Sequence, residues 1–203
     1  DGTDLVALSA EGAELSQAGS RRRVAVDAVV LATGGFGAAQ PLLERHAPAA
    51  AQAVRAGGRH ADGTALRVTE GLAPALACMD AYQGQPHVSP HLRDGVRPRF
   101  GASLPALGAI MVSRAGLRFA AEDLGPSELT AHLLAQPGGV AVEIWDAAAQ
   151  ASAMAGGPFR HAAALDVIAR CDSVAELAAR FALPEATLRA TLDHAARCAR
   201  GDA

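Results

Sequence analysis

The stretch Val24-Ala25-Val26-Asp27-Ala28-Val29-Val30-Leu31-Ala32-Thr33-Gly34-Gly35-Phe36-Gly37 decides the expected fold. A valine-rich apolar run ends in a glycine-rich turn, and a helix-like segment, residues 38–46, follows it. This order is typical of a buried strand, a turn and a helix. Glycines leave backbone amides bare of side chains, and bare amides near a helix N-terminus suit phosphate or another anion. The stretch therefore predicts the place where a nucleotide contacts the chain.

The dinucleotide-binding fingerprint G-x-G-x-x-G is incomplete in this turn. It would fall on Gly35, Gly37 and position 40, where Gln40 replaces the third glycine. That glycine normally permits close packing of helix and strand. The sequence contains no complete fingerprint of this kind and no P-loop. From the residues alone, a nucleotide-binding turn and an ordinary strand–turn–helix both remain open.

Three motifs, taken in order, resemble a flavoprotein family. They are VVLATGGF at residues 29–36, ADGTALR at 61–67 and GLRF at 116–119, the last followed by Glu122. Their order and spacing resemble those of fumarate reductase, succinate dehydrogenase and 3-ketosteroid dehydrogenase, with the tricarballylate dehydrogenase-like enzymes. The resemblance extends over most of the chain. It implies an FAD-dependent oxidoreductase that transfers hydride between a substrate C–C bond and the flavin.

The same resemblance sets the expected fold and domains. It implies an α/β (α+β) class, with a partial FAD-binding domain at residues 1–37 and a mixed α+β cap domain at 38–203. In the family, a first glycine motif would lie before residue 1 and a last flavin-binding segment after residue 203. We therefore expect an internal fragment of a flavoenzyme that is inactive alone.

The resemblance also proposes cofactor contacts. In the family, the ATGG strand end lies against FAD, so Ala32, Thr33 and Gly34, with Gly35 beside them, are expected near its adenosine or pyrophosphate part. Asp62 stands where the family has the Asp of G-D-G, although Ala61 replaces the first glycine. Asp62 is expected to cap the following helix, to contact FAD, or to do both.

Substrate contacts are expected in residues 83–91. Fumarate reductases carry Q-x-H-P-T here, and alignment on the proline matches Gln83 to the Gln, puts Gln85 in place of the His, and puts His87 in place of the Thr. Gln and neutral His both donate hydrogen bonds, so these three residues are candidates for binding a substrate carbonyl or carboxylate. Solvated loop residues are the alternative. The prolines around His87 and His91 oppose a helical metal pair, and we predict no metal site.

The residue that acts as the catalytic acid or base cannot be assigned from the sequence. Fumarate reductases carry a proton-donating Arg four residues after the position of Glu122, where this chain has Pro126. Proline cannot transfer a proton, so a ketosteroid or another carboxylate is a better expectation than fumarate. Three arginines in the preceding loop would suit a dicarboxylate or lie in solvent: Arg93, Arg97 and Arg99.

Composition bounds the other functions. The chain has 203 residues and a net charge of −3, which gives no electrostatic case for nucleic acid or an anionic membrane. Three cysteines without C-x-x-C spacing argue against a disulfide framework or a zinc site. The apolar runs are too short to span a membrane. We expect a cytoplasmic protein with a small-molecule substrate, and an electron-transfer partner or a homo-oligomer for the intact protein.

Periodicity and turn signals predict the remaining elements. Strands are expected at residues 3–9, 21–31, 107–112 and 140–145, with a strand or extended segment at 73–82. Residues 10–20 are expected to form a loop, and 83–107 show no period. Helices are expected at 40–45, 64–71, 127–134, 147–154, 173–180 and 184–199.

The two C-terminal helices raise functions of other classes. Residues 176–189 have the rhythm of a DNA-binding helix-turn-helix, but Glu185 and Asp193 flank Arg189 on the helix that would read bases. Their apolar spacing is better explained by two helices that pack on each other. A nucleotide-binding domain and a non-catalytic helical interaction module remain as alternative functions.

Overall fold

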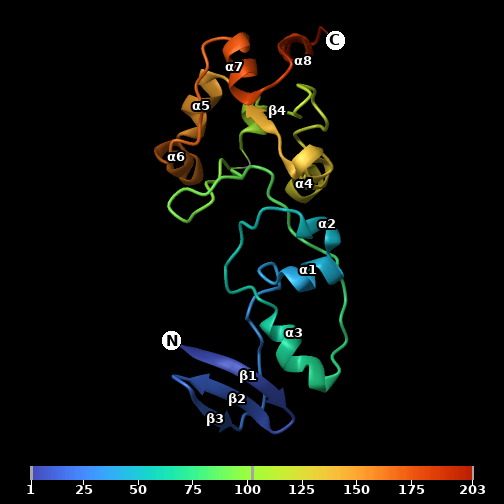
Figure 1. Ribbon diagram of the computed structural model, residues 1–203, viewed down its shortest axis with the longest axis vertical. Helices are drawn as coiled ribbons and strands as arrows, with labels where there is room; N and C mark the ends of the chain where they lie inside the picture. Colours follow the sequence, from blue (N-terminus) through green and yellow to red (C-terminus); the bar gives the residue numbers. More distant parts are fainter. Residues whose placement is uncertain (1, 102, 203) are drawn as a thin grey trace. The chain divides into compact units, whose positions relative to one another are not determined.

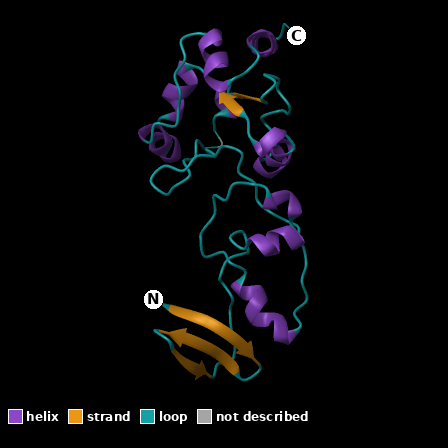
Figure 2. Ribbon diagram, in the orientation of Figure 1, coloured by secondary structure: helices purple, strands orange, loops and turns teal. Residues whose placement is uncertain are grey.

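The chain forms two compact units (Figure 1). A computed structural model describes residues 2–101 and 103–202. Unit 1 contains the described residues through Ala51 together with Arg55–Tyr82, and unit 2 contains Gln52–Val54 and the described residues from Gln83 onward. Helices and small antiparallel sheets build the chain (Figure 2), which confirms the predicted α+β character. The division into flavin and cap domains near residue 37 stays a prediction.

Unit 1 begins with a three-stranded antiparallel sheet in the order β1-β2-β3. Its strands are β1 (Thr3–Ser9), β2 (Gly12–Gln17) and β3 (Ser20–Val24). The prediction of the first strand is confirmed, but the predicted loop over residues 10–20 is wrong, because β2 occupies most of it. The alternation of Ala13 and Leu15 with Glu14 and Ser16 is short, and the surrounding glycines and serines are typical turn signals, so a loop was predicted.

The valine-rich run does not form the predicted buried strand. Strand β3 ends at Val24, and no strand is assigned to residues 25–39. Val30 is 90% exposed, and Val26 and Val29 are more than 40% exposed. A buried parallel strand needs neighbouring strands and covering helices, and β1–β3 pair only among themselves. The run is apolar in sequence, but the described residues of unit 1 leave these three valines exposed.

The helices of unit 1 follow their sequence signals. Helix α1 (Gln40–His46) has Pro41 in its first turn, a position where the missing N–H costs nothing. Short α2 (Pro48–Ala51) follows, and α3 (Thr64–Thr69) continues into the 3₁₀ turn η1 (Glu70–Leu72). Helix α3 contacts β1 (Figure 1). The strand or extended segment expected at residues 73–82 does not form a strand.

Unit 2 is built around a two-stranded antiparallel sheet. Strand β4 (Ile110–Val112) pairs with β5 (Val142–Ile144), with Met111 opposite Glu143. Both strands lie inside their predicted ranges. The other elements are η2 (Pro105–Leu107), α4 (Pro126–Leu134), η3 (Pro137–Gly139), α5 (Ala147–Ala153), α6 (Gly157–Ala164), α7 (Val174–Phe181) and α8 (Glu185–Arg200).

Helix starts in unit 2 show why most of these predictions hold. The Asp146 carboxylate accepts the Ala149 N–H at 2.8 Å and caps α5. The Ser173 hydroxyl accepts the Glu176 N–H at 3.1 Å and caps α7. Helix α6 was not predicted, because its Gly157-Pro158 start follows another glycine and resembles a loop.

Two apolar clusters form the core of unit 2. The first gathers Leu104, Ala109, Ala153 and Phe159, with three half-buried residues packed against it: Phe100, Trp145 and Ile168. The Trp145 and Phe159 rings meet edge to face, with centroids 5.8 Å apart. Both rings are large apolar groups in a chain whose sequence is only 3% aromatic.

The second cluster joins the small sheet to the C-terminal helices. Val112, Ala178, Leu183 and Leu188 are buried in it, and side chains of β4, β5, α7 and α8 pack around them. The prediction that the two helices pack on each other is confirmed. Phe181, the last residue of α7, is 38% exposed. Among the helices of the described residues, none is long and apolar enough to cross a membrane.

Candidate functional site

Two glycine-containing turns of unit 1 lie against each other. One follows the valine-rich run, and the other, residues 61–63, precedes α3. The Ala38 N–H donates to the Ala61 carbonyl oxygen at 2.7 Å, and the Gly63 N–H donates to the Gly35 carbonyl oxygen at 3.1 Å. Two of the three motifs that resemble the flavoprotein family therefore form one local site.

The first turn has open backbone and an unsatisfied polar group. Gly34 has a φ of 79°, a conformation that favours glycine, and no atom lies within 4 Å of the place a Cβ would take at Gly35 or Gly37. The Thr33 Oγ1 atom is buried and has no hydrogen-bond partner among the described residues. Buried hydroxyls normally have a partner. The turn therefore fits a cofactor that brings hydrogen-bonding groups to an exposed backbone, as FAD does.

The Asp62 carboxylate accepts hydrogen bonds from the first residue of α3. Its Oδ1 accepts the Thr64 hydroxyl at 2.6 Å and the Thr64 N–H at 3.0 Å. The N-cap position itself is Gly63, with a left-handed φ of 78°, so Asp62 caps from one residue further out than predicted. The Thr64 hydrogen bonds, helped by the positive charge of Arg67, hold the pKa of Asp62 below its ordinary value of 3.8.

This lowered pKa gives a testable pH dependence. Because the carboxylate is favoured in the folded protein, its contribution is complete above about pH 4 and is lost as pH falls through the folded pKa. The Thr64 amide resonance should titrate with a midpoint below 3.8. In Asp62→Asn that titration should vanish, while Glu70→Gln should leave it unchanged. A Thr64 midpoint at or above 3.8 would contradict the assigned contact.

The substrate-binding candidates occupy one segment of unit 2 but differ in exposure. Gln83 and Gln85 are exposed, and their side chains make no hydrogen bond to another of the described residues. Between them, the Gly84 N–H donates to the Ser127 hydroxyl at 3.2 Å, which ties the segment to the first turn of α4. His87 is only 5% exposed. The segment thus has two exposed side-chain amides, of Gln83 and Gln85, and one buried imidazole, of His87.

His87 is fixed by a residue that the sequence analysis missed. Its Nδ1 lies 2.9 Å from Oε1 of Glu143, whose side chain is 10% exposed. Glu143 is the one charged residue in the apolar stretch of residues 140–145, and that anomaly was the available signal. His91, considered beside His87 in the sequence, is exposed and lines a different feature, a pocket of unit 2.

Glu122 holds the turn after β4 together. Its Oε1 accepts the Met111 N–H at 2.8 Å and the Arg118 Nε–H at 3.0 Å, and its Oε2 pairs with Arg118 Nη2. The hydrogen bonds to Glu122 raise the pKa of Arg118 above its ordinary value. Glu122 is 8% exposed, and these bonds occupy both carboxylate oxygens. The GLRF motif and its Glu therefore have a clear structural role in this chain.

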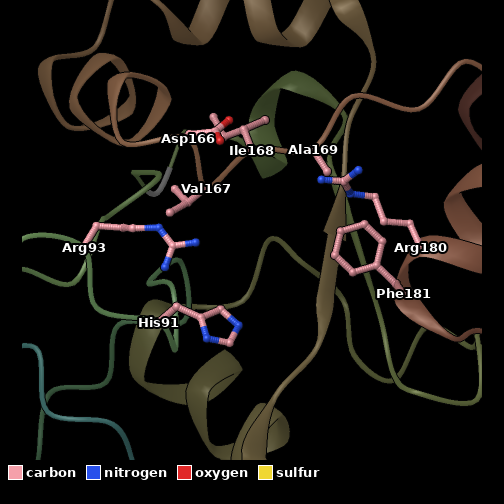
Figure 3. A pocket seen from close by; sticks show the side chains of 8 residues that line it. All are labelled: His91, Arg93, Asp166, Val167, Ile168, Ala169, Arg180 and Phe181. Carbon is pink, nitrogen blue, oxygen red and sulfur yellow. The ribbon is translucent and has the colours of Figure 1, made fainter.

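A shallow pocket lies beside the loop that carries the arginines. Its volume is about 150 Å³. Figure 3 shows the side chains that line it. Of the three loop arginines considered as dicarboxylate ligands, Arg93 lines this pocket, and Arg97 instead donates to the Pro90 carbonyl oxygen. The pocket is lined by His91, Arg93, Asp166, Val167, Ile168, Ala169, Arg180 and Phe181. Its charged lining residues are exposed, so solvent screens them.

The comparisons with known proteins agree with these features. The model of the family described as "FAD binding domain" matches residues 3–203. The chain therefore belongs to the FAD binding domain family, which confirms the predicted flavoprotein class and FAD as its cofactor. No curated protein matches the chain.

Solved structures of flavoenzymes share the fold. The open conformation of a flavocytochrome c3 fumarate reductase is 24% identical, with a TM-score of 0.73, over 98% of this chain and 35% of that one. The 3-ketosteroid-Δ4-(5α)-dehydrogenase of Rhodococcus jostii RHA1 is 25% identical, with a TM-score of 0.59, over 93% and 37%. The 3-ketosteroid Δ1-dehydrogenase of Sterolibacterium denitrificans is 21% identical, with a TM-score of 0.69, over 94% and 38%. The chain thus spans little more than a third of their lengths.

Proposed function

We propose that the chain is part of an FAD-dependent oxidoreductase that transfers hydride between a substrate C–C bond and the flavin. The match of the FAD binding domain family to residues 3–203 carries this proposal. The open glycine turn, with its unpartnered Thr33 hydroxyl, supports it independently. When bound, the flavin supplies the hydride chemistry, and the protein binds and orients both cofactor and substrate.

The residues proposed to hold FAD are Ala32, Thr33, Gly34 and Gly35. Small side chains and a left-handed glycine let a cofactor approach the backbone, and Thr33 offers it a hydroxyl. Asp62 contributes differently, since its carboxylate accepts two hydrogen bonds from Thr64. We propose that Asp62 fixes the neighbouring turn, whose Gly63 N–H bonds to Gly35, and so supports the cofactor-binding residues indirectly.

The residues proposed to bind substrate are Gln83, Gln85 and His87. The exposed amides of Gln83 and Gln85 can donate to a carbonyl or carboxylate oxygen, and a donor placed there polarises the adjacent C–C bond. Pro126 begins α4, where fumarate reductases would carry the proton-donating Arg. A ketosteroid-like ketone, or a carboxylate other than fumarate, therefore suits this chain better. Because the flavin must exchange its electrons, we also propose an electron-transfer partner, and sizing the intact protein tests the alternative of a homo-oligomer.

Replacing Thr33 with valine tests the cofactor site. The apoprotein should keep its stability or gain up to about 3 kcal/mol, because the change removes a buried hydroxyl without a partner. The affinity for FAD should fall about 3- to 10-fold, the value of one lost hydrogen bond. Flavin fluorescence quenching measures the affinity, and urea denaturation measures the stability.

Thr69→Val is the matched control, since the Thr69 hydroxyl bonds the Ala65 carbonyl oxygen at 2.7 Å inside α3. This control should lose a little stability and keep its FAD affinity. Equal FAD affinities for wild type and Thr33→Val would remove Thr33 from the proposed cofactor site.

A further inference from the structure

The contact between His87 and Glu143 joins two parts of unit 2 that are far apart in sequence. His87 lies in the segment of residues 83–91, and Glu143 is the middle residue of β5, separated from it by 56 positions. Both side chains are nearly buried, at 5% and 10% exposure. Burying a carboxylate is costly unless it is well paired. The His87–Glu143 contact is therefore a nearly buried pair and not an ordinary ion pair on the protein surface.

Each partner of this pair sits on fixed backbone. The His87 carbonyl oxygen accepts the Phe100 N–H at 2.9 Å, and the Ser89 N–H donates to the Pro98 carbonyl oxygen at 2.9 Å. Glu143 stands opposite Met111 in the β4–β5 ladder. The imidazole is consequently held from two sides, by its own chain and by a neighbouring sheet. The backbone bonds fix the place where the ring is attached, and the 2.9 Å contact with Glu143 fixes the orientation of the ring.

The carboxylate also decides which ring nitrogen carries the proton. An ionised carboxylate only accepts hydrogen bonds, so the Nδ1 of His87 must be the donor across the 2.9 Å contact. The Nε2 atom has no hydrogen-bond partner among the described residues. In the neutral ring Nε2 is then a free acceptor, and in the protonated ring it is a free donor. Only the Nε2 position can gain or lose a proton while the contact stays intact.

We propose that Glu143 is a positioning residue that fixes the tautomer and the orientation of His87, so that Nε2 alone meets the substrate. This inference rests on the proposed function, in which His87 contacts substrate. The protonated ring would donate to a carboxylate or carbonyl oxygen, and the neutral ring would accept a proton from a substrate O–H or an acidic C–H. In both forms of the ring, the Glu143 carboxylate accepts the hydrogen bond from Nδ1–H, as an orienting carboxylate does beside a working histidine.

The test is ¹⁵N NMR of the intact flavoprotein labelled at histidine. The neutral wild-type His87 should carry its proton on Nδ1, whereas histidines in water favour Nε2. In Glu143→Leu, His87 should revert to the Nε2–H form, and in Glu143→Gln it should keep the Nδ1–H form, because the amide oxygen still accepts. Glu128→Gln, an exposed glutamate of α4, is the control and should change nothing.

The role of Glu143 would be overturned if wild-type His87 carried its proton on Nε2. It would also be overturned if His87 kept the Nδ1–H form in Glu143→Leu. If Glu143→Leu fails to fold, the tautomers of wild type and Glu143→Gln still test the proposal. A wild-type His87 without a proton on Nδ1 is enough to reject the proposed role of Glu143.

Titration with two probes separates this inference from the proposed function. Succinate and 4-androstene-3,17-dione are added in turn, and the His87 Nε2 shift is followed. The inference predicts a shift in wild type with one probe, and an at least 10-fold weaker apparent affinity in Glu143→Leu. The Nδ1–H tautomer could depend on Glu143 while the Nε2 shift responds to neither probe. That result would contradict the substrate role of His87 and give the His87–Glu143 pair a structural role only.

Discussion

Replacing Gly84 with alanine is expected to destabilise unit 2 by about 1–3 kcal/mol, the usual cost of overpacking. A Cβ at Gly84 would collide with the Thr130 side chain, approaching its Cγ2 to 2.7 Å and its Cβ more closely still. Thr130 is 6% exposed, and its hydroxyl is bonded to the Pro126 carbonyl oxygen at 2.7 Å, so it cannot turn away freely. Urea denaturation measures the loss.

The same collision should disturb the proposed substrate site. Gly84 lies between Gln83 and Gln85, and its N–H bonds to Ser127 at 3.2 Å. Moving this backbone away from α4 displaces both amides, so substrate binding by the intact protein should weaken as well. Gly157→Ala is the control: no atom lies within 4 Å of its Cβ position, and alanine there should keep or slightly raise stability. Equal stabilities of Gly84→Ala and Gly157→Ala would contradict the close contact.

Replacing Phe159 with alanine should have the largest effect on stability, about 3–5 kcal/mol. Phe159 is 2% exposed and packs edge to face on Trp145 in the first apolar cluster of unit 2. Its neighbours in the cluster include Leu104, Ala109 and Ala153, and we expect their packed side chains to relax only partly into the cavity. The expected result is a lower urea midpoint with an unchanged slope.

Two variants check that the effect comes from the cavity. Phe159→Leu should recover more than half of the loss, because it restores most of the volume. Phe181→Ala should cost only about 1 kcal/mol, since that ring is 38% exposed. If Phe159→Ala and Phe181→Ala were equally mild, the first cluster would not be a core.

The sequence predicted best where a local signal sets local structure. Helix α5 begins after the Asp146 cap, and α7 begins after the Ser173 cap, each within one residue of its predicted start. Such caps act within four residues, so no knowledge of the remaining fold is needed. The resemblance to flavoproteins was confirmed for a similar reason, because it rests on several short motifs in a fixed order.

Predictions failed where structure depends on distant partners. The strand expected through Leu31 ends at Val24, because a buried strand forms only beside other strands. Strand β2 was missed, because glycine and serine turn signals outweigh its short alternation of apolar and polar residues. Glu143 was missed as a site residue, since its contact with His87 spans 56 positions that no pattern connects. In the candidate site, the residue types were therefore predictable, but the contacts that hold them were not.

The visible absorption spectrum of the intact protein tests the central claim most directly. Our account predicts the absorption bands of oxidised flavin, which should stay with the protein through gel filtration and bleach when a substrate is oxidised. A colourless protein that FAD cannot reconstitute would contradict the assignment of the glycine turn at Thr33 and Gly34 to a flavin.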